Sequence, residues 1–423
     1  MITRFSCKNF KNINTLGVDF KKINILIGPN NAGKTNFIKA LSFLAEMLTL
    51  GRENSYKSSF LQAISHNGWE RVLDKQAAHK KREINLSWNI QLEQCGFTYN
   101  FDFNVGKDAQ QDFFITREEL ENIERPAYEL RPFNYFSCHT LNNGVGEFST
   151  ATRKGQVNKR KSITISNTDT VLLQLRDILF ENPSLYKDNV LRTETVPFLE
   201  KIENYFKKFH FYSSALFNAA QMRAPQDIKR QGVILEKDGS NFVNVFNEYK
   251  ASNIFFKNTF DEKLRELIPD LKLTDVVIKH DKLVFTLGLN DNTQYDLEDM
   301  SDGTLKAMLL IMLIYLPINQ GYSLLAIDEP EMNLHPAWQK ALGKWIQLSS
   351  NFKQCFISTH SPDFLDVFTD GFRNGSVAVF VFDPKADTLV KELSYEVIQE
   401  DLQGWELGDL YRVNEPTLGG WPW

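Results

Sequence analysis

The stretch Ser323-Leu-Leu-Ala-Ile-Asp-Glu-Pro-Glu-Met-Asn-Leu-His-Pro336 is the segment around which the chain is organised. Its apolar run, 324–327, is short enough to form one buried strand of a parallel sheet. The run ends in two adjacent acids, Asp328 and Glu329. Such a pair suits a site where one acid holds Mg²⁺ and the next orients a water that attacks a phosphate. Taken alone, the pattern fits a strand ending in a solvated acidic turn equally well.

A phosphate-binding sequence near the N-terminus favours the metal site over the solvated turn. Residues 28–35, GPNNAGKT, match GxxxxGK[ST] between an expected strand at 23–27 and an expected helix at 36–50. The glycines let backbone N–H groups wrap the phosphates, and the start of the helix adds its positive dipole. A purely structural glycine turn is the alternative, and the strand–loop–helix context argues against it. The residues expected to bind the nucleotide here are Gly28, Asn30, Asn31, Ala32, Gly33, Lys34, Thr35 and Asn36.

Two further segments place polar residues where a phosphate could bind. In the segment 297–304, Ser301 and Gly303 stand directly before an expected helix at 305–315. Free N–H groups at that point form an anion site, although on local grounds an ordinary N-cap explains the serine better. His360 follows an expected strand at 354–358, where it could contact the outermost phosphate or be an ordinary surface histidine.

The bulk composition is that of a globular protein and limits the classes of function. Of the 423 residues, 42% are hydrophobic and 24% are charged, and the formal net charge is −5. The chain is therefore not basic throughout, and any contact with nucleic acid needs a local patch. The four cysteines form no CxxC pair, which argues against a zinc site or a disulfide framework and favours the cytoplasm. The N-terminal segment lacks the long apolar core of a signal peptide, and no apolar run reaches the length of a membrane span.

Outside the motifs, hydrophobic patterning predicts an antiparallel sheet followed by a mainly helical region. Strands are expected at 2–7, 83–91, 97–105, 112–116 and 377–382, with a further candidate at 161–166, and a turn is expected at Asn9-Phe10-Lys11. Later elements are a mostly helical stretch at 170–220, a strand at 233–235, a turn at 238–241, one helix running through Leu267, a hairpin at 276–287 and a helix at 338–348.

Two surface segments are candidates for contact with a partner. A basic tract around Gly155 could contact nucleic acid or protein, although a solvated hairpin tip explains it better. The aromatic tail Trp421-Pro-Trp423 could anchor a partner or fold back on its own domain. The charged residues of the basic tract are Arg153, Lys154, Lys159, Arg160 and Lys161.

Together these pieces resemble the ABC-type ATPases of the SMC/RecF class, in particular their compact OLD-like and AAA-type members. The resemblance is carried, in the family's order, by NFK at 9–11, GPNNAGKTN at 28–36, MSDGT at 300–304, LLAIDEPEMNLHP at 324–336 and STHSPDFL at 358–365. It implies an α/β fold: an ABC-type ATPase head with a mixed central sheet, an antiparallel β subdomain and a helical insert. The expected segments are an N-terminal ATPase lobe at 1–168, the insert at 169–270 and a C-terminal ATPase lobe at 271–423.

The resemblance also assigns roles around ATP and Mg²⁺. Lys34 would bind phosphates, and Thr35 and Asp328 would hold the metal. Glu329 would polarise the attacking water, and His360 would be the switch histidine.

Ser301 and Gly303 resemble the signature loop, which in this class completes the nucleotide site of a second protomer. Two ATP molecules would then lie between head-to-tail subunits. The chain departs from the family at His335, where many members carry an aspartate. No glutamine between 60 and 170 is assigned to the family's Q-loop.

Three functions fit these observations. The first, which we prefer, is an ATP-driven switch subunit that controls a separate nuclease or toxin in anti-phage defence, or that acts in DNA maintenance and repair as RecF-like ATPases do. The second is a self-contained nuclease of the OLD type. Only about forty residues follow the last expected strand, and no Asp-x-Asp pair occurs, which argues against it. The third is a nucleotide-binding scaffold without hydrolysis, which Glu329 argues against.

Overall fold

The chain forms two compact units, each assembled from segments that are distant in the sequence. The first comprises Met1–Lys21, Asn30–Phe209 and Phe382–Glu392, and the second Lys22–Pro29, His210–Val381 and Leu393–Trp423. The three contiguous segments expected from the sequence, with boundaries after 168 and 270, stay a prediction. This computed structural model describes residues 1–50, 58–68, 71–74, 82–93, 95–105, 113–124, 134–139, 145–149, 160–165, 169–174, 196–228, 235–317, 321–384, 389–413 and 415–418.

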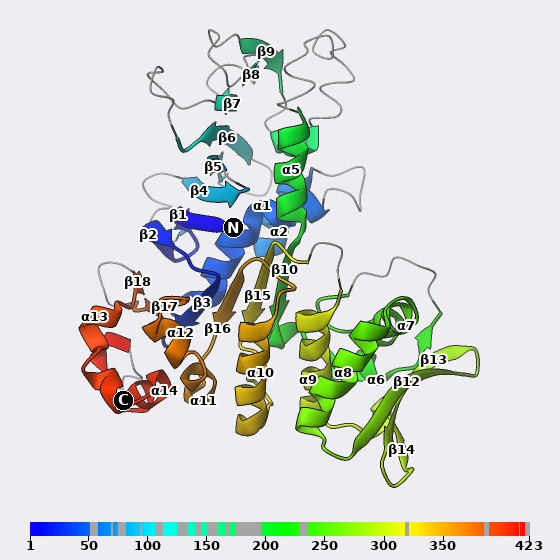
Figure 1. Ribbon diagram of the computed structural model, residues 1–423. Helices are drawn as coiled ribbons and strands as arrows, with labels where there is room; N and C mark the ends of the chain where they lie inside the picture. Colours follow the sequence, from blue (N-terminus) through cyan, green and yellow to red (C-terminus); the bar gives the residue numbers. More distant parts are fainter. Residues whose placement is uncertain are drawn as a thin grey trace. The chain divides into compact units, whose positions relative to one another are not determined.

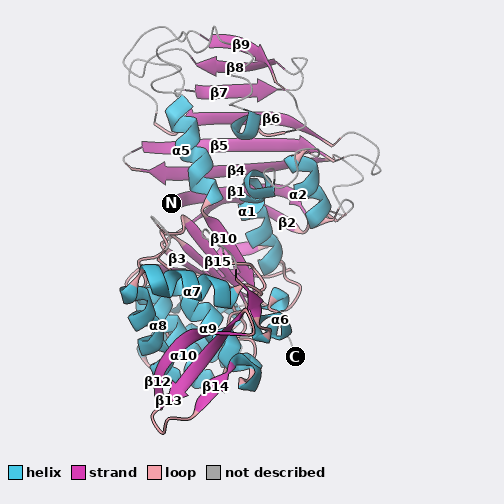
Figure 2. Ribbon diagram, turned by 90° about the vertical axis from the view of Figure 1, so that its right-hand side faces the viewer, coloured by secondary structure: helices cyan, strands magenta, loops and turns pink. Residues whose placement is uncertain are grey.

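The first unit is built on an eight-stranded antiparallel sheet (Figure 2). On strand β4 the side chains alternate, so that Ile84, Leu86, Trp88 and Ile90 are fully or almost fully buried on one face. In order across the sheet, the strands are β2 (Ile13–Asp19), β1 (Ile2–Phe10), β4 (Glu83–Leu92), β5 (Cys95–Asn104), β6 (Phe114–Asn122), β7 (Asn134–His139), β8 (Val145–Ser149) and β9 (Arg160–Thr164).

Helices α1 (Lys34–Leu50), α2 (Ser59–Asn67) and α5 (Val196–Lys207) lie across the apolar face of this sheet (Figure 2). Trp88 lies at the centre, where its ring meets Phe5 and Phe206, and its Nε1 donates to the carbonyl of Leu41 at 2.9 Å. A buried tryptophan whose N–H is satisfied adds apolar contact without an unpaired donor. The sheet therefore supports helix α1, which continues from the phosphate loop.

The second unit contains the sheet that carries the acids. Its strands follow the order β10 (Phe209–Ser213), β15 (Leu324–Asp328), β16 (Cys355–Ser358), β3 (Ile23–Ile27) and β17 (Val377–Phe382). The ladders from β15 through β16 and β3 to β17 are parallel. Every residue of these four strands is buried, as expected for a parallel sheet covered on both faces. The short β18 (Val390–Glu392) is grouped with the first unit.

Helix α9 (Asp302–Tyr315) belongs to the core of the second unit, since Thr304 and every residue from Leu305 to Ile314 is buried. A helix that is apolar all round is stable only when it is packed on all sides. The other elements of this unit are η4 (Ser214–Leu216), α6 (Ala219–Arg223), β11 (Gln226–Asp227), α7 (Phe242–Ser252), α8 (Ile254–Leu267), β12 (Leu271–Lys279), β13 (Lys282–Leu289), β14 (Gln294–Asp296), η5 (Leu297–Asp299), α10 (Pro336–Leu348), α11 (Pro362–Asp366), α12 (Thr369–Arg373), α13 (Tyr395–Ile398), η6 (Asp401–Gln403), α14 (Leu407–Arg412) and η7 (Pro416–Leu418) (Figure 1).

The α/β class and most of the expected elements are confirmed. The hairpin at 276–287 is β12 and β13, the strand at 377–382 is β17, and the helix at 338–348 is α10. The antiparallel sheet expected beside the nucleotide loop is the sheet of the first unit. The strand expected at 112–116 was placed too early, since β6 begins at Phe114 and continues to Asn122.

The turn expected at Asn9-Phe10-Lys11 was placed too early, since it lies at Lys11-Asn12, between the paired residues Phe10 and Ile13. Strand β1 continues through Phe10, and a further strand, β2, runs from Ile13 to Asp19. Asn9 and Lys11 have positive φ, and the register of β1 against β2 shifts between Cys7 and Phe10. With a bulge of this kind, strand β1 continues past the left-handed residue Asn9, although such a residue usually marks the end of a strand.

Two helical predictions were also wrong. The stretch 170–220 was read mostly as helix, but Phe209–Ser213 forms strand β10 of the parallel sheet. The single helix through Leu267 is two helices, because the side chain of Asn253 caps a new helix by accepting from the amide of Phe256 at 3.0 Å. The strand expected at 233–235 lies mostly outside the described residues.

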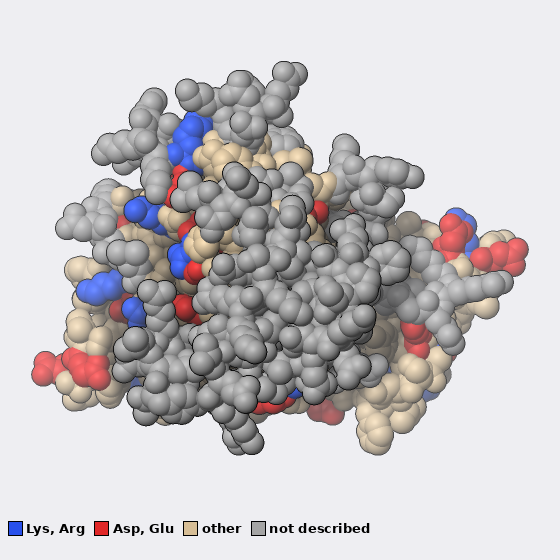
Figure 3. Space-filling model, turned by 90° about the horizontal axis from the view of Figure 1, so that it is seen from above, with Lys and Arg blue, Asp and Glu red and all other residues tan. Residues whose placement is uncertain are grey.

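The basic tract and the aromatic tail lie largely outside the residues that the structure describes. Residues 153–159 and 421–423 lie outside the described residues, and of the tract only strand β9 at Arg160 and Lys161 is described. In the view of Figure 3, the basic and acidic side chains of the described residues are interspersed. A local patch for nucleic acid therefore stays a prediction.

Candidate functional site

The phosphate loop starts at the end of strand β3 and leads into helix α1. Gly28, Asn31 and Gly33 have φ values of 138°, 61° and 107°, a run of left-handed conformations that turns the backbone sharply. Such turns present successive N–H groups to an anion. Lys34 opens the helix and is only 5% exposed, and the amide of Phe37 closes the first turn on the carbonyl of Gly33 at 2.8 Å. The local geometry is that of a phosphate-binding loop.

Asn12 supports the part of this loop that belongs to the first unit. Its Nδ2 donates to the carbonyl of Ala32 at 3.3 Å, and its Oδ1 accepts from Asn36 at 2.8 Å. The φ of +107° at Gly33 favours glycine, and a Cβ there would also lie 2.6 Å from the end of the Asn12 side chain. Sequence reasoning assigned Asn36 to the nucleotide, whereas here it contacts Asn12. Asn12 itself was missed, and its position next to the resemblance at 9–11 was the available signal.

In the second unit, the parallel register brings three strand ends to one edge. Asp328 pairs with Ser358 in the neighbouring strand, and Ser358 pairs with Leu26, two residues before Gly28. The start of the phosphate loop, the first acid and the segment before His360 therefore emerge at the carboxyl edge of one sheet. This edge is where open α/β sheets bind ligands.

Two serine hydroxyls orient the carboxylate of Asp328, which is 6% exposed. Ser358 Oγ donates to Oδ1, and Ser213 Oγ, from β10, donates to Oδ2 at 3.2 Å. Hydrogen bonds of this type fix the direction of a metal-binding carboxylate. Sequence reasoning missed Ser213, because it lies in the strand that was taken for helix.

Glu329 occupies a strained position immediately after the strand. Its φ is +51°, and its amide donates to both the carbonyl and the hydroxyl of Ser358 at 3.1 Å. The carbonyl of Glu329 accepts from the hydroxyl of Ser214. A non-glycine residue held in the left-handed region costs on the order of 1 kcal/mol and persists only where its surroundings over-determine it. The backbone is thus fixed on two sides, while a third of the side chain remains exposed.

His360 lies beside Glu329. Its Nε2 is 3.5 Å from Glu329 Oε1, and its side chain is 17% exposed. Its backbone amide donates to Oε1 of Glu331 at 2.7 Å, and Thr359 Oγ1 donates to the same oxygen at 2.8 Å. The turn after β15 and the segment after β16 are therefore joined directly.

Glu331 is a buried acid that sequence reasoning did not single out, although it lies within the opening stretch. Burial raises the pKa of its carboxyl above the usual value, and hydrogen bonds from His360 and Thr359 oppose this. Its second oxygen, Oε2, has no hydrogen-bond partner in the part of the chain that the structure describes.

The signature-like loop has the N-cap geometry that local sequence favoured. Ser301 Oγ accepts from the amide of Thr304 at 3.2 Å at the start of helix α9. A Cβ on Gly303 would lie 2.7 Å from the carbonyl oxygen of Asn333, so the loop approaches the turn after the acids as closely as glycine allows. His335, which stands where many family members have an aspartate, caps helix α10 by accepting from Ala337 at 3.2 Å.

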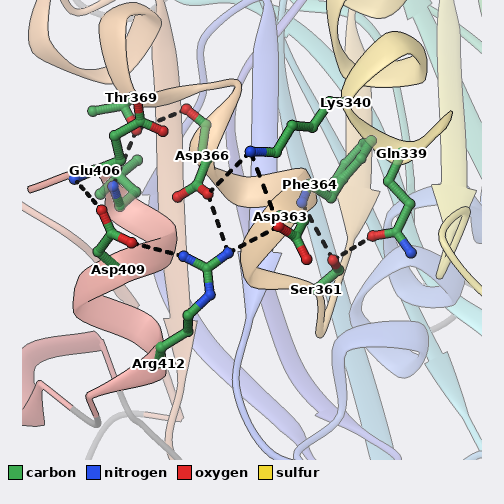
Figure 4. Close-up of polar contacts among 11 residues, drawn as sticks. Gln339, Lys340, Ser361, Asp363, Phe364, Asp366, Thr369, Glu406, Asp409 and Arg412 are labelled. Atoms are coloured by element: carbon green, nitrogen blue, oxygen red, sulfur yellow. Dashed lines mark hydrogen bonds and ion pairs between the residues drawn. The ribbon is translucent and has the colours of Figure 1, made fainter. Parts of the chain in front are cut away.

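A polar cluster joins the segment after His360 to the C-terminal helix α14 (Figure 4). The guanidinium of Arg412 binds Asp363 at 3.0 Å, Asp366 at 3.2 Å and Asp409 at 2.7 Å. A Cβ on Gly408 would lie 2.1 Å from atoms of α11, which explains how closely the two helices pack.

From the same helix α14, the hydroxyl of Tyr411 is hydrogen-bonded to the backbone of Gly28. Tyr411 is only 3% exposed. Helix α14 therefore contacts the first glycine of the phosphate loop, a role that sequence reasoning did not find because nothing local to Tyr411 indicates it.

The donor set at the carboxyl edge fits a small hard cation held together with a phosphate. Asp328 offers carboxylate oxygen, and Mg²⁺ is usually bound through one or two carboxylates plus waters and phosphate oxygens. Among the described residues no group of three or more His, Cys, Asp or Glu side chains could hold a metal by itself. Within the described ranges, no helix is long and apolar enough to cross a membrane.

The chain is similar to several known proteins. Across 82% of its length the chain is 21% identical to the "Retron Vc95 probable ATPase" of Vibrio cholerae serotype O1 biovar El Tor, covering 68% of that protein. It is 22% identical to the "ATP/GTP phosphatase" of Helicobacter pylori (strain ATCC 700392 / 26695), over 99% of this chain and 100% of that protein. A structure of an SmcHead bound to the C-winged helix domain of ScpA overlaps 94% of this chain and 99% of that chain with a TM-score of 0.47 at 12% identity.

A family model described as "AAA domain, putative AbiEii toxin, Type IV TA system" matches residues 23–366. The match begins with strand β3 and ends with helix α11, so it includes the phosphate loop, the signature-like loop, the acids and His360. It confirms the AAA-type ATPase domain expected from the motifs. The chain therefore belongs to this AAA-domain ATPase family.

Proposed function

We propose that the chain is an ATP-binding and ATP-hydrolysing switch subunit that closes head to tail on a second copy of itself. The observation that carries this proposal is the linkage of Asp328, Glu329 and His360 at the carboxyl edge of one parallel sheet. Glu329 takes the role of orienting and deprotonating the attacking water, and His360, 3.5 Å away, contacts the outermost phosphate.

The groups that bind the nucleotide follow from the same assignment. Lys34 neutralises the outer phosphates, and Thr35 and Asp328 hold Mg²⁺. When bound, the metal supplies charge neutralisation at the phosphate oxygens. The two serines that fix the Asp328 carboxylate keep it directed at the carboxyl edge.

Two substitutions test the catalytic assignment. Glu329→Gln keeps ATP affinity but lowers turnover by about 100-fold or more, because removing a general base costs factors of about 10² to 10⁴. Lys34→Ala loses ATP binding. The measurements are affinity for a fluorescent ATP analogue, phosphate release with Mg²⁺, and thermal unfolding to confirm folding. Glu262→Gln, on an exposed side chain, is the matched control. Turnover of Glu329→Gln within a few-fold of the unmodified protein would refute the role of Glu329.

The head-to-tail pair is tested by mixing two inactive variants. Ser301→Arg impairs the loop that acts on the other subunit's nucleotide, and Lys34→Ala impairs the subunit's own site. A mixture regains part of the activity, because each mixed pair contains one intact composite site. Absence of rescue at every mixing ratio contradicts independent composite sites.

We further propose that the output is control of a separate effector, a nuclease or toxin in anti-phage defence. Similarity to a protein named as a retron ATPase supports a role of this kind. The purified chain should not cleave DNA or RNA, with or without ATP and Mg²⁺, whereas addition of the neighbouring gene's product should produce an ATP-dependent activity. Cleavage by the chain alone, lost on mutation of acids other than Asp328 and Glu329, supports the OLD-type nuclease instead.

A further inference from the structure

Lys306 is a buried lysine between the signature-like loop and the acids. It lies in helix α9, is 1% exposed, and its Nζ donates to the carbonyl of Met332 at 2.6 Å. Met332 belongs to the turn that follows Glu329. The charged groups that act on the ammonium are the carboxylates of Glu331 and Glu329. Lysines are almost never fully buried unless they are paired, so this position calls for a role.

The turn at 329–334 needs an external support. Two of its residues, Glu329 and Asn333, are non-glycine residues with φ of +51° and +63°. Within the turn, Met332 N contacts Glu329 O at 3.2 Å and Leu334 N contacts Glu331 O at 3.0 Å. Left-handed positions of this kind are held by their surroundings.

Helix α9 supplies that support through two neighbouring carbonyls of the turn. The ammonium of Lys306 binds the carbonyl of Met332, and the carbonyl of Asn333 fits against Gly303 where a Cβ would lie only 2.7 Å away. Ser301 caps the N-terminus of α9, and Gly303 lies in the first turn of the helix. The signature-like loop and the turn that bears Glu329 are therefore held together at adjacent points.

We propose that Lys306 is a positioning residue for Glu329, which fixes the acid-bearing turn to helix α9 so that a shift of the signature-like loop shifts Glu329. This inference rests on the proposed function, because it takes Glu329 to act in ATP hydrolysis. A nucleotide held by a second copy against Ser301 thereby acts on the hydrolytic centre of the first copy. Small displacements at this distance from the chemistry are costly, since about 1 Å can lower a rate by about 100-fold.

The ammonium also offsets negative charge in the turn. Burial lowers the pKa of Lys306 to about 8, and attraction to Glu331 and Glu329 opposes this. At neutral pH the side chain is mostly charged, and it loses its proton at moderately alkaline pH. Arginine stays charged throughout this pH range but differs from lysine in length and shape. The Lys306→Arg variant therefore separates the effect of the positive charge from that of the lysine side-chain geometry.

Three variants test the proposal in the full-length chain: Lys306→Met, Lys306→Arg and, as a control on the exposed face of α10, Lys344→Met. Lys306→Met keeps ATP-analogue affinity within about threefold and lowers turnover at least about tenfold, whereas Lys306→Arg recovers part of the turnover. Turnover of the unmodified protein declines above about pH 8, and the arginine variant lacks that decline. Thermal unfolding establishes that each variant is folded.

A second measurement does not depend on activity. Amide hydrogen exchange in 329–334 rises in Lys306→Met and is unchanged in Lys344→Met, because the turn has lost its support. Unchanged exchange together with turnover within twofold overturns the role of Lys306. Absence of ATP hydrolysis by the unmodified protein, with exchange still raised in Lys306→Met, refutes the proposed function and leaves the support of the turn intact.

Discussion

The backbone amide of His360 donates a hydrogen bond of 2.7 Å to the carboxylate of Glu331. The same oxygen accepts from Thr359 at 2.8 Å, so one buried acid holds the segment after β16 against the turn after β15. Glu329 and His360, whose side chains are 3.5 Å apart, stand on the two segments that Glu331 joins. Their separation is therefore set by a residue with no assigned role in the chemistry.

Replacing Glu331 by alanine should both destabilise the chain and lower turnover. Two buried donors, from Thr359 and His360, lose their acceptor, and such a loss costs about 1–3 kcal/mol. Glu331→Gln keeps an oxygen acceptor and should cost less. Urea unfolding gives the free energies, with the exposed Glu400→Ala expected within about 0.5 kcal/mol of the unmodified protein. Equal stability of the alanine and glutamine variants would contradict the assigned contacts.

Gly303→Ala should lower turnover sharply while Gly404→Ala leaves it unchanged. A Cβ at 303 would meet the carbonyl oxygen of Asn333 at 2.7 Å, a backbone atom that can yield only if the turn shifts. A Cβ at 404 meets nothing within 4 Å. Phosphate release and urea unfolding of the two variants provide the comparison. Unimpaired turnover in Gly303→Ala would show that the turn accommodates the methyl group.

The first unit should lose stability as the pH rises, through Glu118. This residue is 1% exposed and accepts hydrogen bonds from Tyr99, Thr170 and the amide of Val171. Burial raises the pKa of its carboxyl from 4.5 to about 7. The folded state therefore binds the proton more tightly than the unfolded state, and the stabilisation present at pH 4.5 is lost between pH 4.5 and 7.

The contribution of Glu118 is on the order of 3 kcal/mol, and Glu118→Gln should abolish it. Measured by urea unfolding, the variant gains stability relative to the unmodified protein as the pH is raised from 4.5 to 8. The exposed Glu93→Gln should show no such change. A difference between Glu118→Gln and the unmodified protein that does not vary with pH would rule out this titration.

Tyr411→Phe should weaken nucleotide binding about fivefold without unfolding the chain. The substitution removes one hydroxyl from the backbone of Gly28, and a hydrogen bond of this kind contributes about 1 kcal/mol. Tyr395→Phe, in the same C-terminal segment but 37% exposed, is the control. The dissociation constant of a fluorescent ATP analogue is the measurement, and equal constants for both variants would exclude a role for Tyr411 in shaping the loop.

The candidate residues found from the sequence are those whose neighbours in the sequence form a recognisable motif. Asp328 and Glu329 end an apolar run, and Lys34 stands in a loop between a strand and a helix, so local pattern was enough to single them out as candidates. The structure places Asp328, Glu329 and His360 at one edge of the parallel sheet, and their roles toward a nucleotide stay predictions. The roles of Ser301 and Gly303 toward a second nucleotide, and of the loop residues from Gly28 to Asn36 toward their own, stay predictions.

The residues that sequence reasoning missed act through distant pairings. Ser213 reaches Asp328 only because β10 lies beside β15 in the sheet. The strand is five residues long and follows a helix, and its aromatic alternation was too short to stand out within a helical region. Tyr411 and Asn12 contact the phosphate loop from other parts of the chain. No window along the sequence contains such contacts.

Strand β3 has a consequence for biosynthesis. It is made early, yet its partners are β16 and β17, so that Ile25 faces Ile357 on one side and Val379 on the other. During translation this strand has no neighbours, and its four buried apolar residues need protection until residue 381 has left the ribosome. Pairings of such long range are slow to form. The nascent chain should therefore depend on chaperones for most of its synthesis, and its ability to hold a nucleotide should appear only in the last stage.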